Sequence, residues 1–425
     1  MAQRVIFHVD ANSAFLSWSA VYRIKVMGEK TDLREIPAVV AGDKESRHSI
    51  ILAKSIPAKK YGIQTGEPLF LALEKCPNLV VVQPDYPLYV EASRHFVQIL
   101  RQFSPCVEQY SIDEAWADMT GTERLYGAPR LAAEAMRKRI YEELGFTVNV
   151  GISSNKLLAK MAGDLEKPNK VHTLFPEEVP QKMWPLPVRD LFSVGAATQK
   201  KLNLMGIYTI GDLANADVKL LQKRFGKPGQ TIWHFANGRS ADAVRPVQPE
   251  NKGYGNSITT ATDVTSTEGA HQVLLGLCET VAARMRQDGM CGGCIMVHLR
   301  TNEFNHISHQ SRLHGATNIT EELFREACRV FDEAWDGVTP LRQLGVQMTH
   351  LAREPYQQFD LFSDVTPERY ERKLRLDETV DALRDKYGED AIRRAKFTTC
   401  PEGHMTGGLD KARRTGVTKP VPDEF

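Results

Sequence analysis

Apolar and polar positions over the first 165 residues or so switch between strand and helix periodicities. Residues 4–9 form a short β-rich apolar run that ends at Asp10, and apolar residues recur at helical spacing from Ala14 onwards. Residues 107–120 alternate like a strand, apart from the adjacent acids Asp113 and Glu114. Further strands are expected at 38–40, 50–52 and 147–152, and further helices at 91–103, from Asn155 and around Lys59. This mixture predicts an α/β or α+β domain.

The pattern changes further along the chain. Prolines clustered at residues 168–187 predict a linker, and repeated glycines at 190–240 are typical of short helices joined by tight turns. Residues 251–350 follow the order strand, helix, strand, strand, helix, strand, which predicts a small α+β module. A final helix is expected because four apolar residues share one helical face, and residues after 397 are expected to be unstructured. Those four residues are Leu376, Val380, Leu383 and Tyr387.

The composition is that of an ordinary globular protein, with 425 residues, 42% hydrophobic and 25% charged. This length accommodates about two to four domains. No apolar run approaches the roughly 20 residues of a membrane span, so we expect a cytoplasmic protein without a membrane partner. The seven cysteines are scattered and odd in number, which predicts reduced thiols.

Positive and negative charges are nearly balanced, with 54 Lys and Arg against 53 Asp and Glu. Only residues 171–240 are clearly basic, with nine basic against five acidic side chains. Binding to nucleic acid would therefore depend on local patches rather than on the total charge.

Three carboxylates interrupt strands that are otherwise apolar. Asp10 ends one strand, and Asp113 and Glu114 interrupt another. Buried like charges repel, and Mg²⁺ with its preference for oxygen ligands offsets that repulsion. Two such ions about 3.5–4 Å apart would support phosphoryl or nucleotidyl transfer. The same pattern would arise if Asp10 capped the following helix and Asp113 and Glu114 lay at a solvated strand edge. The pattern alone does not distinguish a metal site from this structural role.

Three motifs in this order resemble those of the Y-family translesion DNA polymerases, and most closely the bacterial DNA polymerase IV-like enzymes. They are HVDANSAF, YSIDEAW and GISSNKLLAKMAGDLEKPNK, within a similarity that runs over roughly residues 3–395. The resemblance implies a multidomain α+β right-hand fold: a palm with a mixed sheet, small fingers, a helix-hairpin-helix thumb and an α+β little finger. It implies a palm at 1–12 and 75–166, fingers at 13–74, a thumb at 167–239, a linker at 240–250, a little finger at 251–352 and a tail at 353–425.

The same resemblance assigns roles in the active site. Asp10, Asp113 and Glu114 would bind two Mg²⁺ ions together with the backbone carbonyl of Ala11. Asn12 stands where the family often has a second aspartate that is not counted among the ligands.

Three further residues would contact the incoming nucleotide. Phe15 would be the steric gate that excludes a ribose 2′-hydroxyl, although helical periodicity alone fits a core phenylalanine equally well. Lys167 would approach the triphosphate, and Lys59 stands where arginine is usual. Ala53 and Ile56 replace threonine and tyrosine, which leaves fewer phosphate donors on this helix; Lys54 and Lys60 could compensate, but solvated surface lysines are the favoured interpretation.

Two segments are expected to hold DNA. Residues 191–214 read as helix, glycine-bearing hairpin and helix, with Ser193 in place of the usual first glycine, and helix amide groups there would bind a phosphate. Gly195, Lys200 and Lys201 are the candidate contacts in this segment. In the little finger, Lys252, Arg300 and Arg312 would share one face, with acids on the helices behind.

A metal site of another kind is disfavoured in the little finger. Cys291 and Cys294 precede His306 and His309 at a spacing reminiscent of a zinc finger. The histidines lie in a strand-like run, whereas a finger requires them on a helix.

The segment QFDLF in the tail resembles the peptide by which bacterial polymerases dock on the sliding clamp. Gln358, Leu361 and Phe362 would enter preformed pockets as part of an extended segment. Packing of the same short apolar run on its own domain is the alternative.

The leading hypothesis is a monomeric, template-directed, low-fidelity DNA polymerase that extends primers past damaged bases. Its partners would be primer-template DNA, deoxynucleoside triphosphates and the sliding clamp. A noncatalytic DNA-binding accessory factor would lack the acids, and a metal-dependent nuclease would have no need of Phe15 or Lys167.

Overall fold

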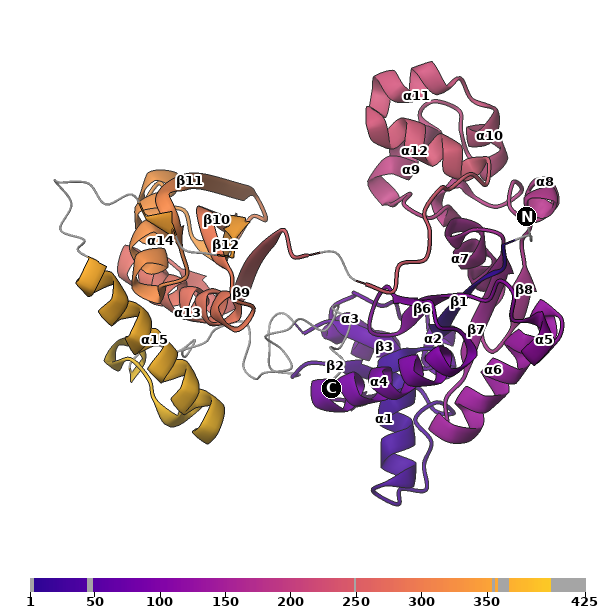
Figure 1. Ribbon diagram of the computed structural model, residues 1–425, viewed down its shortest axis with the longest axis horizontal. Coiled ribbons are helices and arrows are strands. Elements are labelled where there is room, and N and C mark those ends of the chain that lie inside the picture. Colours follow the sequence, from indigo (N-terminus) through magenta and orange to yellow (C-terminus); the bar gives the residue numbers. More distant parts are fainter. Residues whose placement is uncertain (1–3, 44–48, 248–249, 354–355, 358–366, 399–425) are drawn as a thin grey trace. The chain divides into compact units, whose positions relative to one another are not determined.

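The computed structural model describes residues 4–43, 49–247, 250–353, 356–357 and 367–398 (Figure 1). The described residues up to 247 form one compact unit, and those from 250 onwards form a second. Each unit has its own hydrophobic core. The two units are described separately below.

A five-stranded sheet forms the centre of the first unit. Its order is β5 (Val107–Gln109), β6 (Glu114–Asp118), β1 (Ile6–Ala11), β7 (Val148–Ser153) and β8 (Val171–Thr173). The central strand β1 is antiparallel to both neighbours, β6 and β7. The apolar run ending at Asp10 is therefore a strand as predicted, and it is buried because it lies in the middle of the sheet.

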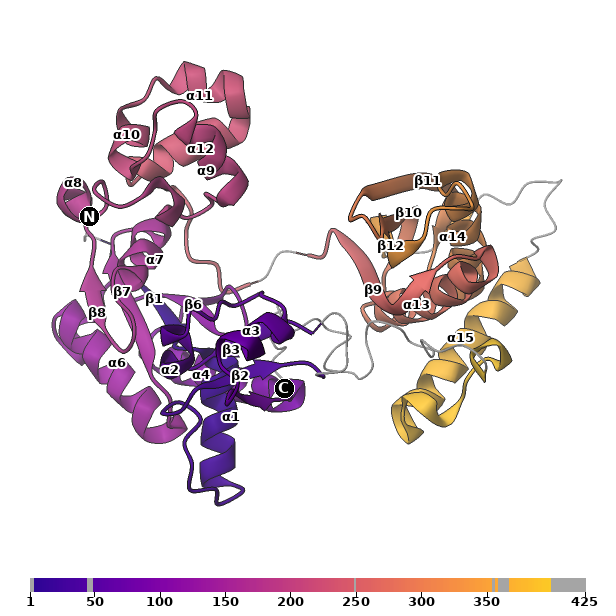
Figure 2. The same cartoon turned by 180° about the vertical axis from the view of Figure 1, so that it is seen from behind.

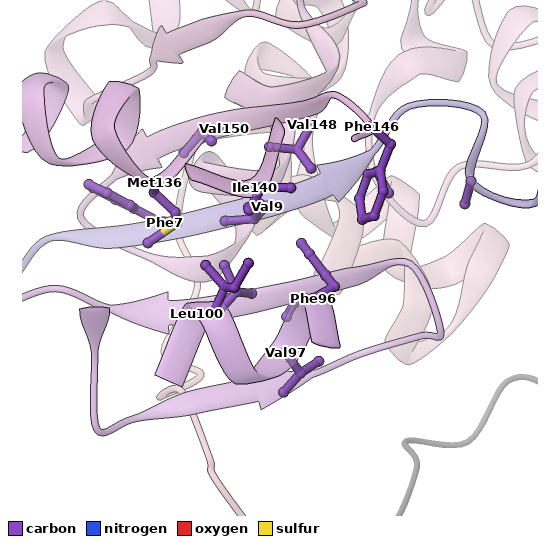
Figure 3. Close-up of a cluster of buried hydrophobic side chains, with 14 of the residues drawn as sticks. Phe7, Val9, Phe96, Val97, Leu100, Met136, Ile140, Phe146, Val148 and Val150 are labelled. Atoms are coloured by element: carbon purple, nitrogen blue, oxygen red, sulfur yellow. The ribbon is translucent and has the colours of Figure 1, made fainter. Parts of the chain in front are cut away.

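Helices cover both faces of this sheet. On one face, α1 (Ala14–Lys25), α4 (Tyr86–Phe103) and α6 (Pro129–Leu144) enclose a core around Phe7 and Val9. Figure 3 shows side chains from α4 and α6 around these strand residues. Since side chains alternate along a strand, His8 and Asp10 lie on the opposite face.

The helix α7 (Lys156–Asp164) packs on that opposite face unusually closely. A Cβ atom at Gly151 of β7 would lie only 2.0 Å from the carbonyl oxygen of Ala159 in α7. Only glycine permits this approach, which brings Lys160 and the loop after α7 to the face that carries Asp10.

The structure corrects three predictions in this unit. Residues 107–120 are a hairpin, because the amides of Tyr110 and Ser111 both donate to the carbonyl of Glu114, at 3.0 and 3.2 Å. The proline-rich segment 168–187 is not simply a linker, because β8 within it pairs with β7. The helix α4 begins before residue 91, since Asp85 caps it by accepting from the Leu88 amide at 3.1 Å.

A smaller sheet follows α1 in the chain and has a core of its own. Its order is β3 (Ile51–Lys54), β2 (Ala38–Ala41) and β4 (Val80–Val82), with α2 (Ile56–Lys60) and α3 (Leu69–Lys75) nearby. The short helix α5 (Glu123–Tyr126) follows β6.

Short helices make up the rest of the first unit, as the glycine spacing predicts. They are α8 (Val179–Lys182), α9 (Ala196–Asn203), α10 (Ile210–Asn215), α11 (Val218–Phe225) and α12 (Lys227–Ala236), with 3₁₀ turns at Pro176–Glu178 and Val188–Asp190. Gly226 joins α11 to α12 with a φ of 68°, which explains a glycine at this position. Leu157 and Leu158 of α7 belong to the same core and connect these helices to the central sheet.

The second unit contains the predicted order of strands and helices (Figure 2). Its antiparallel sheet has the order β13 (Tyr356–Gln357), β11 (His306–Thr317), β10 (Cys291–Thr301), β12 (Leu341–Ala352) and β9 (Gly253–Val264). The helices α13 (Thr267–Gln287) and α14 (Thr320–Ala334) pack on one face of this sheet.

The last helix, α15 (Pro367–Tyr387), exists as predicted but does not pack through its apolar stripe. Leu376 and Tyr387 are 59% and 63% exposed, whereas Asp377 and Arg384 are each only 5% exposed. Arg286 of α13 donates to Asp377 at 3.2 Å, and Arg384 donates to Glu279 at 3.3 Å. Buried ion pairs thus fix this helix to the module, followed by 3₁₀ turns at Glu389–Ala391 and Ala395–Thr398.

None of the helices in the described residues has the length and apolar character needed to cross a bilayer.

Candidate active site

The three predicted acids meet at one end of β1. Asp10 and Glu114 are directly opposite each other in the antiparallel pairing of β1 with β6. Opposite residues in such a pair face the same side, so both carboxylates lie on the side covered by α7. The amide of Ala11 donates to the carbonyl of Asp113 at 2.9 Å, which holds the turn before β6 against the end of β1. Acids that are about a hundred residues apart in the sequence are thus brought together in one small site.

Asp113 is the least neutralised of the three acids. Its Oδ1 accepts a hydrogen bond from the Ser111 hydroxyl at 2.6 Å. Burial raises the pKa of Asp113, and the neighbouring charges of Asp10 and Glu114 raise it further, which outweighs the lowering by Ser111. This carboxylate therefore lies where an added cation would be favourable.

Glu114 is held ionised by two basic side chains. Its Oε2 accepts from Nε2 of His8 at 2.8 Å and also from the Lys160 ammonium. Burial acts to raise the pKa of Glu114, but the hydrogen bond from His8 and the charge of Lys160 lower it to about 2. The Lys160 ammonium also lies 5.7 Å from the Tyr110 ring centroid and 5.6 Å from that of Phe192.

Asp10 is paired with Lys167, the residue that the resemblance assigns to the triphosphate. The Lys167 ammonium donates to Oδ2 of Asp10 and, at 2.8 Å, contacts Oδ1 of Asp164. Burial acts to lower the pKa of Lys167, but the charge of Asp10 and hydrogen bonds to Asp10 and Asp164 raise it above its usual range. The cation predicted to meet phosphate thus lies directly beside an acid predicted to bind metal.

The donor set suits a hard divalent cation such as Mg²⁺. Within the described ranges, no group of three His, Cys, Asp or Glu side chains is arranged to hold a metal ion. In this structure two of the predicted acids are engaged by basic side chains: Lys167 contacts Asp10, and His8 and Lys160 contact Glu114. The ligand chemistry nevertheless fits, since carboxylate oxygens are what Mg²⁺ prefers and Asp113 lies beside two like charges that a cation would neutralise.

Phe15 lies on α1, just after the strand that carries Asp10. Its ring stacks on the Tyr89 ring, with centroids 4.5 Å apart and an interplanar angle of 16°. Tyr89 is itself buried, and its hydroxyl shares a 2.9 Å hydrogen bond with Ser19. Phe15 itself is only partly buried, and its ring is supported by that of Tyr89.

The lysines of the small sheet have different surroundings. Lys59 and Lys60 are exposed on α2, which agrees with a solvated surface for Lys60. Lys54 is not a solvated surface lysine, because its ammonium donates to the carbonyl of Ile63 at 2.6 Å. Burial lowers the pKa of Lys54, and the charge of Lys59 lowers it further. Ile56 is half exposed on the same helix.

The predicted DNA contacts in the helical segment are all accessible. Gly195 is the residue before α9, and Lys200 and Lys201 lie in its last turn; all three are exposed. Ser193, which stands in place of a glycine, has a φ of 74°. This left-handed backbone explains why glycine is suited to the position.

Arg300 and Arg312 lie on the open face of the second unit's sheet. Arg300 alternates with the core residues Val297 and Leu299 along β10, and it is opposite His306 of β11. Arg312 is an even number of residues from His306 and therefore shares its face. The acid-bearing helices α13 and α14 cover the other face, as expected.

The remaining predictions have different outcomes. Lys252 precedes β9, and its side chain is exposed. His306 and His309 lie on the strand β11, as the strand-like pattern indicates. Gln358, Leu361 and Phe362, the predicted clamp contacts, lie outside the described residues.

Sequence reasoning missed His8 and Lys160, the partners of Glu114. A weak signal for His8 was present, because it is two residues from Asp10 on one strand and therefore on the same face. No local sequence signal indicated Lys160, because its position depends on how closely α7 packs on β7.

Comparison with known proteins shows the family to which the chain belongs. Residues 9–164 match the model of the impB/mucB/samB family, and residues 251–361 match its C-terminal domain. Residues 189–239 match a DNA polymerase-iota thumb domain. The DNA polymerase IV of Clostridium acetobutylicum is 44% identical over 392 residues, which cover 92% of this chain and 98% of that protein. The chain belongs to the Y family of DNA polymerases.

Other relatives extend this similarity over nearly the whole polymerase. The DNA polymerase IV of Moorella thermoacetica is 39% identical, covering 94% of this chain and 97% of the relative. A solved Y-family DNA polymerase chimera superposes with a TM-score of 0.69 at 21% identity, covering 82% of this chain and 100% of the chimera. At that identity the match establishes the fold alone. The predicted α+β right-hand fold and the resemblance to DNA polymerase IV-like enzymes are confirmed.

Proposed function

We propose that this DNA-directed DNA polymerase adds deoxynucleotides to a primer 3′-hydroxyl by metal-assisted nucleotidyl transfer with two Mg²⁺ ions. The observation that supports the proposal is the meeting of Asp10, Asp113 and Glu114 beside Lys167 at one end of β1. DNA damage bypass follows from membership of the DNA polymerase IV-like group. Low fidelity, a monomeric state and docking on a sliding clamp are parts of the proposal that rest on the resemblance.

The protein's own groups would prepare the site. Asp10, Asp113 and Glu114 would hold the metal ions together with the backbone carbonyl of Ala11. Bound Mg²⁺ activates an attacking hydroxyl and neutralises the charge that develops on the phosphate oxygens. His8 and Lys160 keep Glu114 ionised and ready to accept a cation.

Lys167 would exchange one anionic partner for another. Its ammonium now neutralises Asp10. With Asp10 serving as a metal ligand, the ammonium would lose this partner and be available to the triphosphate, where a compact cation suits phosphate oxygens. Lys59 would approach the same phosphates from α2. The two lysines thus supply positive charge from different parts of the first unit.

The fold divides these tasks among domains. We assign the palm to the five-stranded sheet, the fingers to the small sheet with α2 and α3, and the thumb to residues 176–239, since β8 completes the palm sheet. The little finger is residues 251–352. In the thumb, the proposed contacts to DNA phosphates are Gly195, Lys200 and Lys201. In the little finger, Arg300 and Arg312 would contact DNA from the open face of the sheet.

Primer extension tests the proposal directly. The full-length protein is incubated with Mg²⁺, a labelled primer-template and each deoxynucleotide separately, on intact and lesion-bearing templates. We expect extension that follows the template, continues opposite at least one lesion and includes misincorporated bases. Degradation of the primer without incorporation would show a nuclease instead, and binding without either reaction would show an accessory factor.

The proposed clamp contacts make a separate prediction. Changing Gln358, Leu361 and Phe362 together to alanine should abolish stimulation by a bacterial sliding clamp and leave extension without clamp unchanged, because an extended docking peptide gains its affinity from such pocket-filling side chains. Extension rates with and without clamp give the result. Equal stimulation of the triple variant and the unmodified protein would rule out docking by this segment.

A further inference from the structure

We infer that Asn12 is a positioning residue that, together with Asn149, fixes the loop bearing Lys167 beside Asp10. This inference rests on the proposed role of Lys167 at the triphosphate. The loop comprises residues 165–170, between α7 and β8. Neither asparagine has a place among the residues that the resemblance assigns to metal or nucleotide.

Asn12 follows directly after β1, two residues beyond Asp10, and its amide group makes three contacts. Its Nδ2 donates to Oδ1 of Asn149 at 3.1 Å. Its Oδ1 accepts from the amide of Asn169 at 2.9 Å and from the Thr147 hydroxyl at 3.0 Å. One side chain thus joins the end of β1, the start of β7 and the far end of the loop.

Asn149 of β7 continues this connection beneath the loop. It is completely buried, and its Nδ2 donates to the carbonyl oxygens of Gly163 at 2.9 Å and Glu166 at 2.7 Å. Its Oδ1 also accepts from the amide of Lys170 at 3.3 Å. Together, Asn12 and Asn149 bind the backbone on both sides of Lys167.

Hydrogen bonds must fix this loop because apolar packing does little there. Glu166, Lys167, Pro168 and Lys170 are exposed, Leu165 and Asn169 are only partly buried, and no residue of the loop is fully buried. The conformation at Asn169 is also uncommon, with a φ of 59° in the left-handed region that asparagine tolerates better than most residues. From the outer side, Arg137 of α6 donates to Oδ1 of Asn169 at 2.6 Å.

The positioning matters for Lys167 because its own side chain is long and flexible. Lys167 contacts carboxylates of Asp10 and Asp164, and in the proposed mechanism it leaves Asp10 for the triphosphate. A flexible ammonium finds that second partner efficiently only if its backbone is already in place. The asparagine pair supplies that placement through hydrogen bonds to the backbone on both sides of Lys167.

The pair also explains why asparagine suits position 12 in this chain. The orientation of Asn149 is fixed, since its Nδ2 donates to two carbonyl groups and its Oδ1 must face Asn12. An aspartate at position 12 would set a carboxylate oxygen against that Oδ1 without a hydrogen between them. Asparagine provides the donor for Asn149 and the acceptor for Asn169 at once.

The test combines incorporation kinetics with nucleotide binding in the absence of chemistry. KM and kcat are measured for single-nucleotide incorporation, and the dissociation constant for the nucleotide is measured on a primer that ends in a dideoxynucleotide. Asn12→Ala and Asn149→Ala should raise KM and the dissociation constant about tenfold and change kcat less than about threefold. Thr147→Val removes one contact to Asn12 and should raise KM and the dissociation constant about two- to threefold. This milder variant keeps the test valid if an alanine variant does not fold.

Two further variants separate positioning from a merely structural role. Asn237→Ala in the thumb removes contacts to the carbonyl oxygens of Ala214 and Trp233, and it should lower the melting temperature without changing KM. In a Lys167→Ala background, adding Asn12→Ala should have less than about a twofold further effect on KM, because the two act through one group. Additive effects of Asn12→Ala and Lys167→Ala, or an unchanged KM in the asparagine variants of an active protein, would refute the inference. An unmodified protein that incorporates no nucleotide would instead refute the proposed function.

Discussion

Primer extension should fall at least about 1,000-fold when Asp113→Asn and Glu114→Gln are combined, a loss of about 4 kcal/mol in transition-state stabilisation. Both substitutions keep the size of the side chain and remove the negative charge that would attract Mg²⁺. Single-turnover extension at saturating nucleotide measures the loss. Extension by the double variant at a rate near that of the unmodified protein would contradict the assignment of these acids.

Stability should change in opposite directions for the two single variants, measured in a chelator at neutral pH. The pKa of Asp113 is raised in the folded protein, so its ionised form opposes folding, and Asp113→Asn should raise the melting temperature. The pKa of Glu114 is lowered from 4.5 to about 2. Its contribution is therefore fully present above pH 4.5 and lost as the pH falls toward 2. Glu114→Gln should cost about 1–3 kcal/mol of stability at neutral pH, because Lys160 loses its charged partner.

A neighbouring acid provides the matched control. Glu108 of β5 accepts from the Lys156 ammonium at 2.7 Å on the same sheet, much as Glu114 accepts from Lys160. Glu108→Gln should lower stability and leave extension within about twofold of the unmodified rate. Loss of extension in both Glu108→Gln and Glu114→Gln would point to disruption of the sheet rather than to loss of a ligand.

The acids stood out as candidates because each interrupts a local pattern, and the resemblance to the polymerase family then assigned them to metal. Asp10 lies at the end of an apolar strand as predicted, whereas Asp113 and Glu114 were expected inside one strand and instead lie in the turn and at the start of β6. The hydrogen-bond partners of these acids could not be predicted from a local pattern. The contact between His8 and Glu114 joins residues 106 apart in the chain, and it depends on a pairing register that no local pattern specifies.

The last helix shows the opposite failure of pattern reasoning. The apolar stripe with Leu376 predicted the helix correctly but not the face that packs. Asp377 and Arg384 are buried instead because Arg286 and Glu279 on α13 supply compensating charges. Hydrophobic periodicity assumes that a charged residue faces water, and a buried charge paired across two elements violates that assumption. Conversely, the thumb helices follow from glycine punctuation, which acts locally.

Phe15→Ala should raise the incorporation of ribonucleotides relative to deoxynucleotides about 100-fold, which corresponds to roughly 2.7 kcal/mol of lost discrimination. A steric gate excludes a 2′-hydroxyl only if it cannot move aside, and the stacking of Phe15 on buried Tyr89 provides that rigidity. Relative values of kcat/KM for the two sugars, on the same template, measure the effect. Tyr89→Leu keeps the ring of Phe15 but removes the ring on which it stacks. We therefore expect a smaller rise in ribonucleotide incorporation than in Phe15→Ala.

The alternative for Phe15 is a plain core residue, and the two interpretations predict different patterns. A core role would lower stability and reduce incorporation of both sugars equally. Tyr22 lies on the same helix and is 38% exposed, so Tyr22→Ala controls for loss of an aromatic ring from α1. Discrimination that stays constant in Phe15→Ala, with reduced stability, would assign Phe15 to the core. The steric-gate interpretation predicts that ribonucleotide incorporation rises in Phe15→Ala and Tyr89→Leu but not in Tyr22→Ala. That result would assign sugar selection to the Phe15 ring, supported by Tyr89 in the palm core.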